Sequence, residues 1–424
     1  MPTMSFADLV QTRVVRLLRW SEKYTKTDMV YLTSGGFWLT LGQIGSILFS
    51  LALAIIFGHF ATQDTYGNYK YIINIGSLLS ALSLSGIGPA VTRAAARGQE
   101  GALSQGRALN IKWSWPMVCA GLLASFYYYH VGNTFASTGL LLVSFTLPFI
   151  NGFTLYDPFL VGLREFRLDV IFSIISLAFT TSALAVTLLF FSQRAVILIA
   201  VYFLTNLSTD ALWYVISQRK AHNDAEDPQM LNYGFHLSLM SMIGAIADKI
   251  DSIAIFTFLG PVQLAVYTYA IAMPEQIKAI VKNVSALSLP KFAQRSISEI
   301  KHTITWRLVQ LSLALSIAVI LYILVCPILF RYLFPVYVQS IGYSQLYAVS
   351  VVFAGVISTL VAVMESHRSI KQLYVATNVA PIVIIILLPI LTYYWGILGA
   401  VLAQLVYRLV NAVVTYWQFS TISE

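Results

Sequence analysis

Three charged side chains lie within a stretch that is otherwise as apolar as a membrane span. They are Asp248, Lys249 and Asp251 of GAIADKIDSIAIF, residues 244–256. On a continuous helix the two aspartates share a face because they are three residues apart, and Lys249 points about 100° away. A charge at the bilayer centre costs about 2.5–3.5 kcal/mol, so these groups must face protein or water. Carboxylates in a wet membrane-embedded site can bind a proton or a sodium ion.

Two more charged residues lie near mid-depth in other apolar stretches, Glu275 in AMPEQIK and Arg408 in LVYRLVN. Arg408 is too deep to reach the membrane interface easily by snorkelling. One interpretation is a set of ion pairs, such as Lys249 or Arg408 with a carboxylate, that only fix helix packing. The other is a hydrated cavity in which carboxylates bind a coupling H+ or Na+ and cations meet an anionic substrate. We favour the cavity, and we expect no other cofactor and no metal.

Five further polar side chains lie at matching depths in the first half of the chain. Helix–helix hydrogen bonds are the usual role of such residues in membranes, and cavity lining is the alternative. The five are Gln43, Asn74, Asn151, Asn206 and Asp210.

Long apolar helices are needed to hold these residues. The chain is 58% hydrophobic and 10% charged, with a mean hydropathy of +0.75, far from the balance of a soluble globular protein. Crossing a bilayer takes about 20 apolar residues at 1.5 Å each. Each span must satisfy its backbone hydrogen bonds without water, so we expect an all-α polytopic membrane protein with about twelve transmembrane helices. The predicted spans are 34–58, 66–91, 109–130, 137–161, 169–191, 195–217, 234–259, 262–287, 308–330, 341–365, 372–394 and 396–418.

The basic residues predict the orientation. Twenty-one lysines and arginines, Lys278 among them, fall on the side of the two termini, whereas Lys70, Arg194 and Arg331 fall on the other. Such asymmetry places both termini in the cytoplasm and predicts a multi-pass protein of the cytoplasmic (inner) membrane. The net charge of +8 is thereby explained, and it gives no reason to expect nucleic-acid binding.

The segment before the first span is basic. Arg13, Arg16 and Arg19 repeat every three residues among apolar ones, a pattern typical of an interfacial amphipathic helix. A basic tail that only helps orientation is the alternative.

Catalytic signatures are missing from the sequence. No predicted segment outside the membrane is long enough for a soluble catalytic domain. There is no phosphate loop, no HExxH and no paired CxxC, and the six histidines are scattered. Cys119 and Cys326 both fall within spans, so they indicate neither a disulfide framework nor a metal site. We expect a transporter rather than an enzyme, driven by an ion gradient or by substrate flux.

The two halves of the chain resemble each other at a constant offset of 198 residues. Over residues 36–74 nine positions are identical, where roughly three would match by chance. Among them are Tyr69 with Tyr267 and Tyr71 with Tyr269. An offset of six spans implies parallel repeats, and transporters of this kind carry their substrate between the halves.

The repeat predicts a domain organisation of two six-helix lobes. The predicted units are an N-terminal cytoplasmic amphipathic segment (1–33), an N-lobe (34–217), a cytoplasmic linker (218–232), a C-lobe (233–418) and a C-terminal tail (419–424).

Several stretches resemble a known family. FGHFATQDTYGNYKYIINIGSLLSALSLSGIGPAVTRAAARG (57–98) resembles the passage after the first helix in O-antigen-type polysaccharide flippases, and DKIDSIAIFTFLGPVQLAVYTYA (248–270) resembles their helix 7 to 8 passage. ALSLPKFA (286–293) and LFPVYVQSIGYSQLYA (333–348) resemble later family segments. The likeness identifies the chain as similar to the Wzx-like members of the multidrug/oligosaccharidyl-lipid/polysaccharide exporter superfamily.

The resemblance implies a flippase that turns undecaprenyl-pyrophosphate-linked oligosaccharide from the cytoplasmic to the outer leaflet. It implies as partners the polyprenyl-linked substrate, membrane lipids, a polysaccharide polymerase and a chain-length regulator. The family's lumen is cationic, whereas here Asp248, Asp251 and Glu275 outnumber Lys249 and Arg408. The alternatives are a multidrug antiporter with the same two-lobe plan and a ligase- or polymerase-type membrane enzyme. Such enzymes normally carry a large outer loop, and the outer loops predicted here are short.

Overall fold

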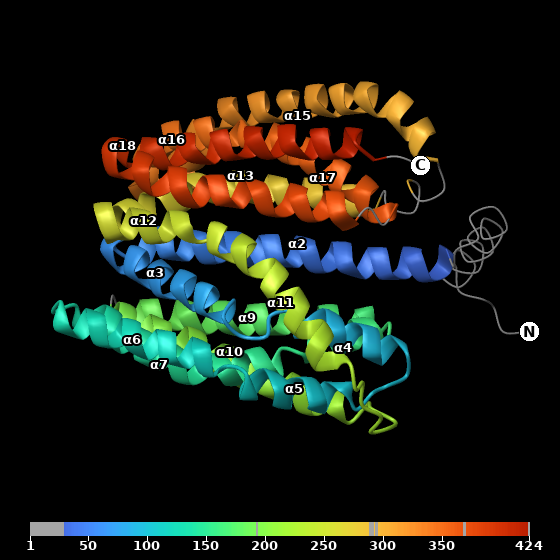
Figure 1. Ribbon diagram of the computed structural model, residues 1–424. Coiled ribbons are helices and arrows are strands. Elements are labelled where there is room, and N and C mark those ends of the chain that lie inside the picture. Colours follow the sequence, from blue (N-terminus) through green and yellow to red (C-terminus); the bar gives the residue numbers. More distant parts are fainter. Residues whose placement is uncertain (1–28, 192–193, 288–291, 293–295, 368–369, 423–424) are drawn as a thin grey trace, which may run out of the picture.

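The computed structural model describes residues 29–191, 194–287, 292, 296–367 and 370–422 of the 424-residue chain. The ordered elements in these ranges are helices (Figure 1). Most of the basic N-terminal segment, including Arg13, Arg16 and Arg19, lies outside the described residues, so its amphipathic character stays a prediction.

Helices in the first half of the chain cover the first six predicted spans. Three of these spans are each divided into two helices. The elements are α2 (Met29–Phe60), α3 (Gln63–Ser80), α4 (Ile87–Ala96), α5 (Ala102–Lys112), α6 (Trp115–His130), α7 (Thr134–Phe153), α8 (Tyr156–Gly162), α9 (Phe166–Phe190) and α10 (Ala195–Gln218).

Helices in the second half cover the other six spans. The last two predicted spans are continuous in α18, which changes direction at Gly396, where φ is +60°. That left-handed backbone is one that glycine adopts without the clash a Cβ would bring. The elements are α11 (Met230–Ala247), α12 (Ile250–Leu259), α13 (Pro261–Leu287), α15 (Ile297–Leu333), η1 (Pro335–Ser340), α16 (Ile341–Ala348), α17 (Ser350–Ser366) and α18 (Ile370–Ser420).

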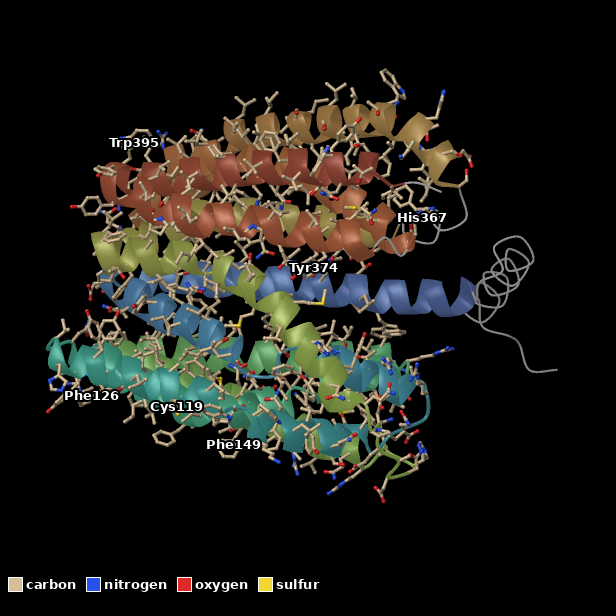
Figure 2. All side chains as sticks on the ribbon, viewed as in Figure 1. Cys119, Phe126, Phe149, His367, Tyr374 and Trp395 are labelled. Carbon is tan, nitrogen blue, oxygen red and sulfur yellow. The ribbon has the colours of Figure 1, made fainter. Side chains whose placement is uncertain are left out.

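The twelve membrane crossings predicted from the sequence are confirmed. Seven helical stretches within the described ranges are each long and apolar enough on their own to cross a bilayer. Spans 2, 3, 4, 7 and 10 were predicted as single helices but are interrupted, at residues 81–86, 113–114, 154–155, 248–249 and 349. The outer surface agrees with a lipid environment, since Phe126 and Phe149 project from it and are 63% and 47% exposed (Figure 2).

Both ends of the described chain lie on one side of the molecule, called here the termini side (Figure 1). The helices of residues 29–218 pack mainly on one another, as do those of residues 230–420. The two groups meet where α3 contacts α12 and α13, and where α11 crosses to pack on α4. We call these groups the N-bundle and the C-bundle, and their identity with two repeated lobes stays a proposal.

On the side opposite the termini, tyrosine side chains pack where the two bundles meet. The ring centroids of Tyr269 and Tyr337 are 3.7 Å apart, and Tyr269 donates a 2.7 Å hydrogen bond to the carbonyl oxygen of Ala54 in the other bundle. Helix α3 approaches α13 so closely that a Cβ on Gly67 would lie 1.8 Å from the Pro261 carbonyl oxygen. The tyrosines paired by the 198-residue offset all lie in this buried core. The bundles are therefore in close contact on this side.

Candidate functional site

A cavity of about 450 Å³ lies within the C-bundle and has charged walls. Helices α13, α17 and α18 contribute to it, together with the break between α11 and α12. Its lining residues are Asp248, Glu275, Lys278, Ala279, Lys282, Ala354, Ile357, Ser358, Val361, Ala362, Glu365 and Arg408.

The break in the seventh span places Asp248 at this cavity. Asp248 is the C-cap of α11 and is exposed, whereas Asp251, in the first turn of α12, is only 6% exposed. The expectation that the two aspartates share one helix face assumed a continuous helix, and it is wrong because α11 ends at Ala247 and α12 begins at Ile250. Of the two aspartates, Asp248 lines the cavity and Asp251 does not.

Glu275 and Lys278 form an ion pair one helical turn apart on α13. The ammonium of Lys278 donates to Glu275 and, at 3.2 Å, to the hydroxyl oxygen of Tyr347, while that hydroxyl donates to Glu275. The Lys278 side chain is 8% exposed and that of Glu275 is 40% exposed. The lysine is therefore held inside the protein, and its carboxylate partner faces the cavity.

Arg408 enters the cavity from α18. Its guanidinium carbon lies 4.9 Å from the ring centroid of Tyr407, and its buried Nε has no hydrogen-bond partner among the described residues. Glu275 and Asp248 are close enough to interact electrostatically with it. Within the described ranges Arg408 has no direct ion pair, so its positive charge stands beside carboxylates and its guanidinium N–H groups are able to meet an anion.

Asp251 lies outside the cavity, at the centre of a buried hydrogen-bond network. It accepts hydrogen bonds from the Ser252 backbone N–H (2.6 Å) and hydroxyl (3.2 Å), from Tyr267 Oη (2.8 Å) and from Gln404 Nε2 (3.4 Å). The Asn74 amide donates to Ser252 Oγ at 2.9 Å. Since Asn74 belongs to the N-bundle, the network joins the two bundles.

Lys249, the N-cap of α12, is half-buried and does not line the cavity. Its charge interacts with those of Asp251 and Lys70. It therefore lies closer to the contact between the bundles than to the charged cavity.

The remaining predicted residues lie apart from the cavity. Asn151 lines a separate pocket of the N-bundle, and Asn206 donates to the Tyr202 carbonyl oxygen of its own helix at 2.7 Å. Asp210 is buried on α10, and Gln43 is half-buried on α2. The structure thus brings together Asp248, Glu275 and Arg408, and it separates them from the other seven.

The sequence reasoning missed several residues of the cavity region, among them the lining residues Lys282, Ser358 and Glu365. Two more, Lys278 and Tyr347, belong to the hydrogen-bonded cluster around Glu275. Lys278, counted above with the basic residues of the cytoplasmic side, is buried at the cavity and paired with Glu275. Its depth was the available signal, because it lies inside the predicted span 262–287, three residues after Glu275. No sequence feature singled out Tyr347. Within the described ranges, no group of three or more histidine, cysteine or acidic side chains is arranged to hold a metal ion.

Comparison with known proteins decides the family. The model of the family described as "Polysaccharide biosynthesis protein" matches residues 32–294, more than half of the chain. The chain belongs to this polysaccharide biosynthesis family. No curated protein matches it.

Solved structures of the exporter superfamily share the fold. "Lipid II flippase MurJ, inward closed conformation" has a TM-score of 0.69 and 12% identity, with 91% of this chain and 87% of that one covered. An inward-facing multidrug resistance MATE family transporter has a TM-score of 0.68 and 14% identity, covering 88% and 94%. A superfamily transporter from Pyrococcus furiosus has a TM-score of 0.61 and 12% identity, covering 92% and 95%. Such low identities show the fold.

Family and fold together place the chain in the polysaccharide biosynthesis family with the multi-pass all-helical membrane fold that the MurJ and MATE structures share.

Proposed function

We propose that this protein flips a polyprenyl-pyrophosphate-linked oligosaccharide, the repeat unit of an O-antigen, capsule or exopolysaccharide, from the cytoplasmic to the outer leaflet. The carrying observation is a membrane-embedded cavity with Lys278 and Arg408 in its wall, in a member of the polysaccharide biosynthesis family. Phosphate groups are anionic, and guanidinium and ammonium groups are the usual partners of phosphate oxygens.

The arrangement of the helices supports alternating access. The N- and C-bundles meet closely on the side opposite the termini, where the tyrosines pack. The positive-inside distribution predicts that the termini side is cytoplasmic, so we infer that this conformation receives substrate from the cytoplasm. Transport then requires the tyrosine contacts to part while the bundles close on the other side.

We assign ion coupling to the carboxylates of the seventh and eighth spans. Glu275 and Asp248 face the cavity, whereas Asp251 connects to Asn74 of the other bundle through Ser252. A proton or sodium ion that neutralises Asp251 would alter the acceptors available to its four donors. Such a change would link the binding of an ion at Asp251 in the C-bundle to the contact between the two bundles.

Flipping measured in vesicles with a fluorescent lipid-linked oligosaccharide tests the proposal. We expect Arg408→Gln to lower the rate about tenfold, as the loss of one charge-assisted hydrogen bond predicts. Arg331→Gln, at an exposed position on α15, is the matched control and should leave the rate unchanged.

Two outcomes would reject the proposal. One is an unaltered flipping rate in a properly inserted Arg408→Gln variant. The other is wild-type protein that moves cationic dyes but no lipid-linked oligosaccharide, which would favour the multidrug antiporter. Association with a polysaccharide polymerase and a chain-length regulator is part of the same proposal, and co-purification from the source cells tests it.

A further inference from the structure

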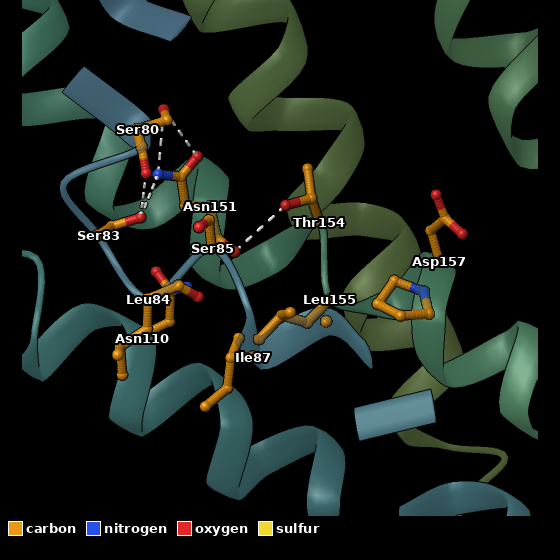
Figure 3. Close-up of a pocket in the computed structure, with 12 residues that line it drawn as sticks. Ser80, Ser83, Leu84, Ser85, Ile87, Asn110, Asn151, Thr154, Leu155 and Asp157 are labelled. Carbon is orange, nitrogen blue, oxygen red and sulfur yellow. Dashed lines mark hydrogen bonds between the residues drawn. The ribbon is translucent and has the colours of Figure 1, made fainter. Parts of the chain in front are cut away.

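A second pocket, of about 290 Å³, lies in the N-bundle and differs in chemistry from the charged cavity (Figure 3). Its size is near the lower end of the range for small-ligand sites. The lining residues are Ser80, Ser83, Leu84, Ser85, Ile87, Gly88, Asn110, Asn151, Thr154, Leu155, Asp157 and Pro158.

Hydroxyl and amide groups dominate the polar lining of this pocket, and neither lysine nor arginine contributes to it. The Asn151 amide nitrogen donates to Ser80 Oγ at 3.2 Å and to Ser83 Oγ at 3.3 Å, so both bonds are longer than typical. Asn110 is only 2% exposed and lines the same pocket, and its Oδ1 has no hydrogen-bond partner among the described residues. Apart from the Asp157 carboxylate at its edge, the pocket thus offers neutral donors and acceptors that are loosely engaged with one another.

Interrupted helices surround the pocket. The α3–α4 break at 81–86 and the α7–α8 break at 154–155 both contribute lining residues. Transporters form substrate sites from discontinuous helices because the break leaves backbone polar groups that a ligand can satisfy. The tenth span is likewise interrupted, at Val349, within a few residues of the 198-residue offset from the α7–α8 break. The charged cavity likewise lies beside a helix break, the one between α11 and α12.

Helix α11 connects the neutral pocket to the charged cavity. At the pocket rim, the Ser85 and Ser241 hydroxyl oxygens are 3.3 Å apart, and the Gly86 backbone N–H donates to Ser238 Oγ at 2.8 Å. Ser241 lies seven residues before Asp248, two turns along one helix face and about 10 Å away. One extended headgroup lying along α11 can therefore reach both sites.

We propose that the neutral pocket binds an uncharged sugar residue of the lipid-linked headgroup, while the charged cavity holds its phosphates. This inference rests on the proposed function and adds a second binding site to it. Hydroxyl and amide groups match the donors and acceptors of sugar hydroxyls, and the exposed carboxylate of Asp157 at the edge can accept further hydrogen bonds. Gly88, Asp157 and Pro158 also line an adjoining hollow of about 570 Å³, which gives room for further sugars.

Binding to purified full-length protein in lipid nanodiscs tests the inference. Two probes are compared: undecaprenyl pyrophosphate, which has no sugar, and the lipid-linked oligosaccharide fraction extracted from the source cells. We expect the wild type to bind the sugar-bearing lipid about tenfold more tightly, as one or two additional hydrogen bonds predict. Asn151→Leu should abolish this preference and leave the affinity for undecaprenyl pyrophosphate unchanged.

Two further variants keep the test decisive. Thr146→Leu is the matched control, because Thr146 lies on the same helix, bonds to its own backbone and is not part of the pocket. Thr154→Val removes one pocket hydroxyl with little change of shape and should reduce the preference about threefold even if Asn151→Leu does not fold.

The outcomes separate this inference from the proposed function. Equal wild-type affinity for the two lipids overturns the sugar pocket, and so does an undiminished tenfold preference in Thr154→Val or in a folded Asn151→Leu variant. The proposed function then still stands if Arg408→Gln weakens binding of undecaprenyl pyrophosphate. If the wild type binds neither lipid, both proposals fail.

Discussion

Removing either partner of the Glu275–Lys278 ion pair on α13 should lower the stability of the protein, but by different amounts. The Lys278 side chain is 8% exposed, and its ammonium donates hydrogen bonds to Glu275 and to the hydroxyl oxygen of Tyr347. Breaking a fully buried pair costs about 3–5 kcal/mol, mostly because one charge is left buried and unpaired. The Glu275 side chain is 40% exposed and partly solvated, so the cost of breaking this pair is smaller than for a fully buried one. We expect Glu275→Gln to destabilise the protein by about 2 kcal/mol.

The reverse substitution should be milder. Lys278→Met fills the buried volume with an apolar side chain and leaves a carboxylate that the cavity can hydrate, so we expect a loss of about 1 kcal/mol. The double variant Glu275→Gln/Lys278→Met should be more stable than Glu275→Gln alone. Unfolding midpoints in one detergent, compared in a double-mutant cycle, provide the measurement. Equal losses for the two single variants, or additive losses in the double variant, would refute this reasoning.

Three other predictions concern the network, the bundle contact and a helix-internal bond. Asp251→Asn should make flipping insensitive to collapse of the proton or sodium gradient, and a vesicle assay with full gradient dependence would contradict the assigned coupling. Gly67→Ala should increase thiol labelling of Gln63→Cys, because the added Cβ cannot lie 1.8 Å from the Pro261 carbonyl oxygen; unchanged labelling would argue against this close approach. Asn206→Leu should change flipping by less than about twofold, since its amide serves its own helix, and a large loss would reassign it to the transport path.

Hydropathy was sufficient to predict the membrane architecture. Twenty apolar residues in succession leave a chain few alternatives in lipid, so spans such as 169–191 and 195–217 agree with α9 and α10 to within a few residues. Breaks were harder to predict. The interruption at Thr154 and Leu155 has a local signal that the prediction of a single span 137–161 did not use: Pro158 has no N–H to donate to the Thr154 carbonyl oxygen, and its ring crowds that oxygen.

The charged residues were recognised more easily than their surroundings. Depth alone marked Asp248, Glu275 and Arg408, and these line one cavity. The α11–α12 break then separated Asp251 from Asp248, which no periodicity argument could anticipate. Lys278 was assigned to the wrong environment because a lysine in the cytoplasmic half of a span usually extends to water, whereas this one turns inward to a carboxylate and a tyrosine.

Water access at position 248 tests the central claim most directly. In a chain with Cys119 and Cys326 replaced by serine, Asp248→Cys should react with a membrane-impermeant maleimide from the termini side, and lipid-linked oligosaccharide should slow the reaction. Ser252→Cys, at a position that is 6% exposed, is the buried control. An unreactive thiol in the Asp248→Cys variant, or a reaction rate that the substrate does not alter, would contradict a hydrated substrate cavity in the C-bundle.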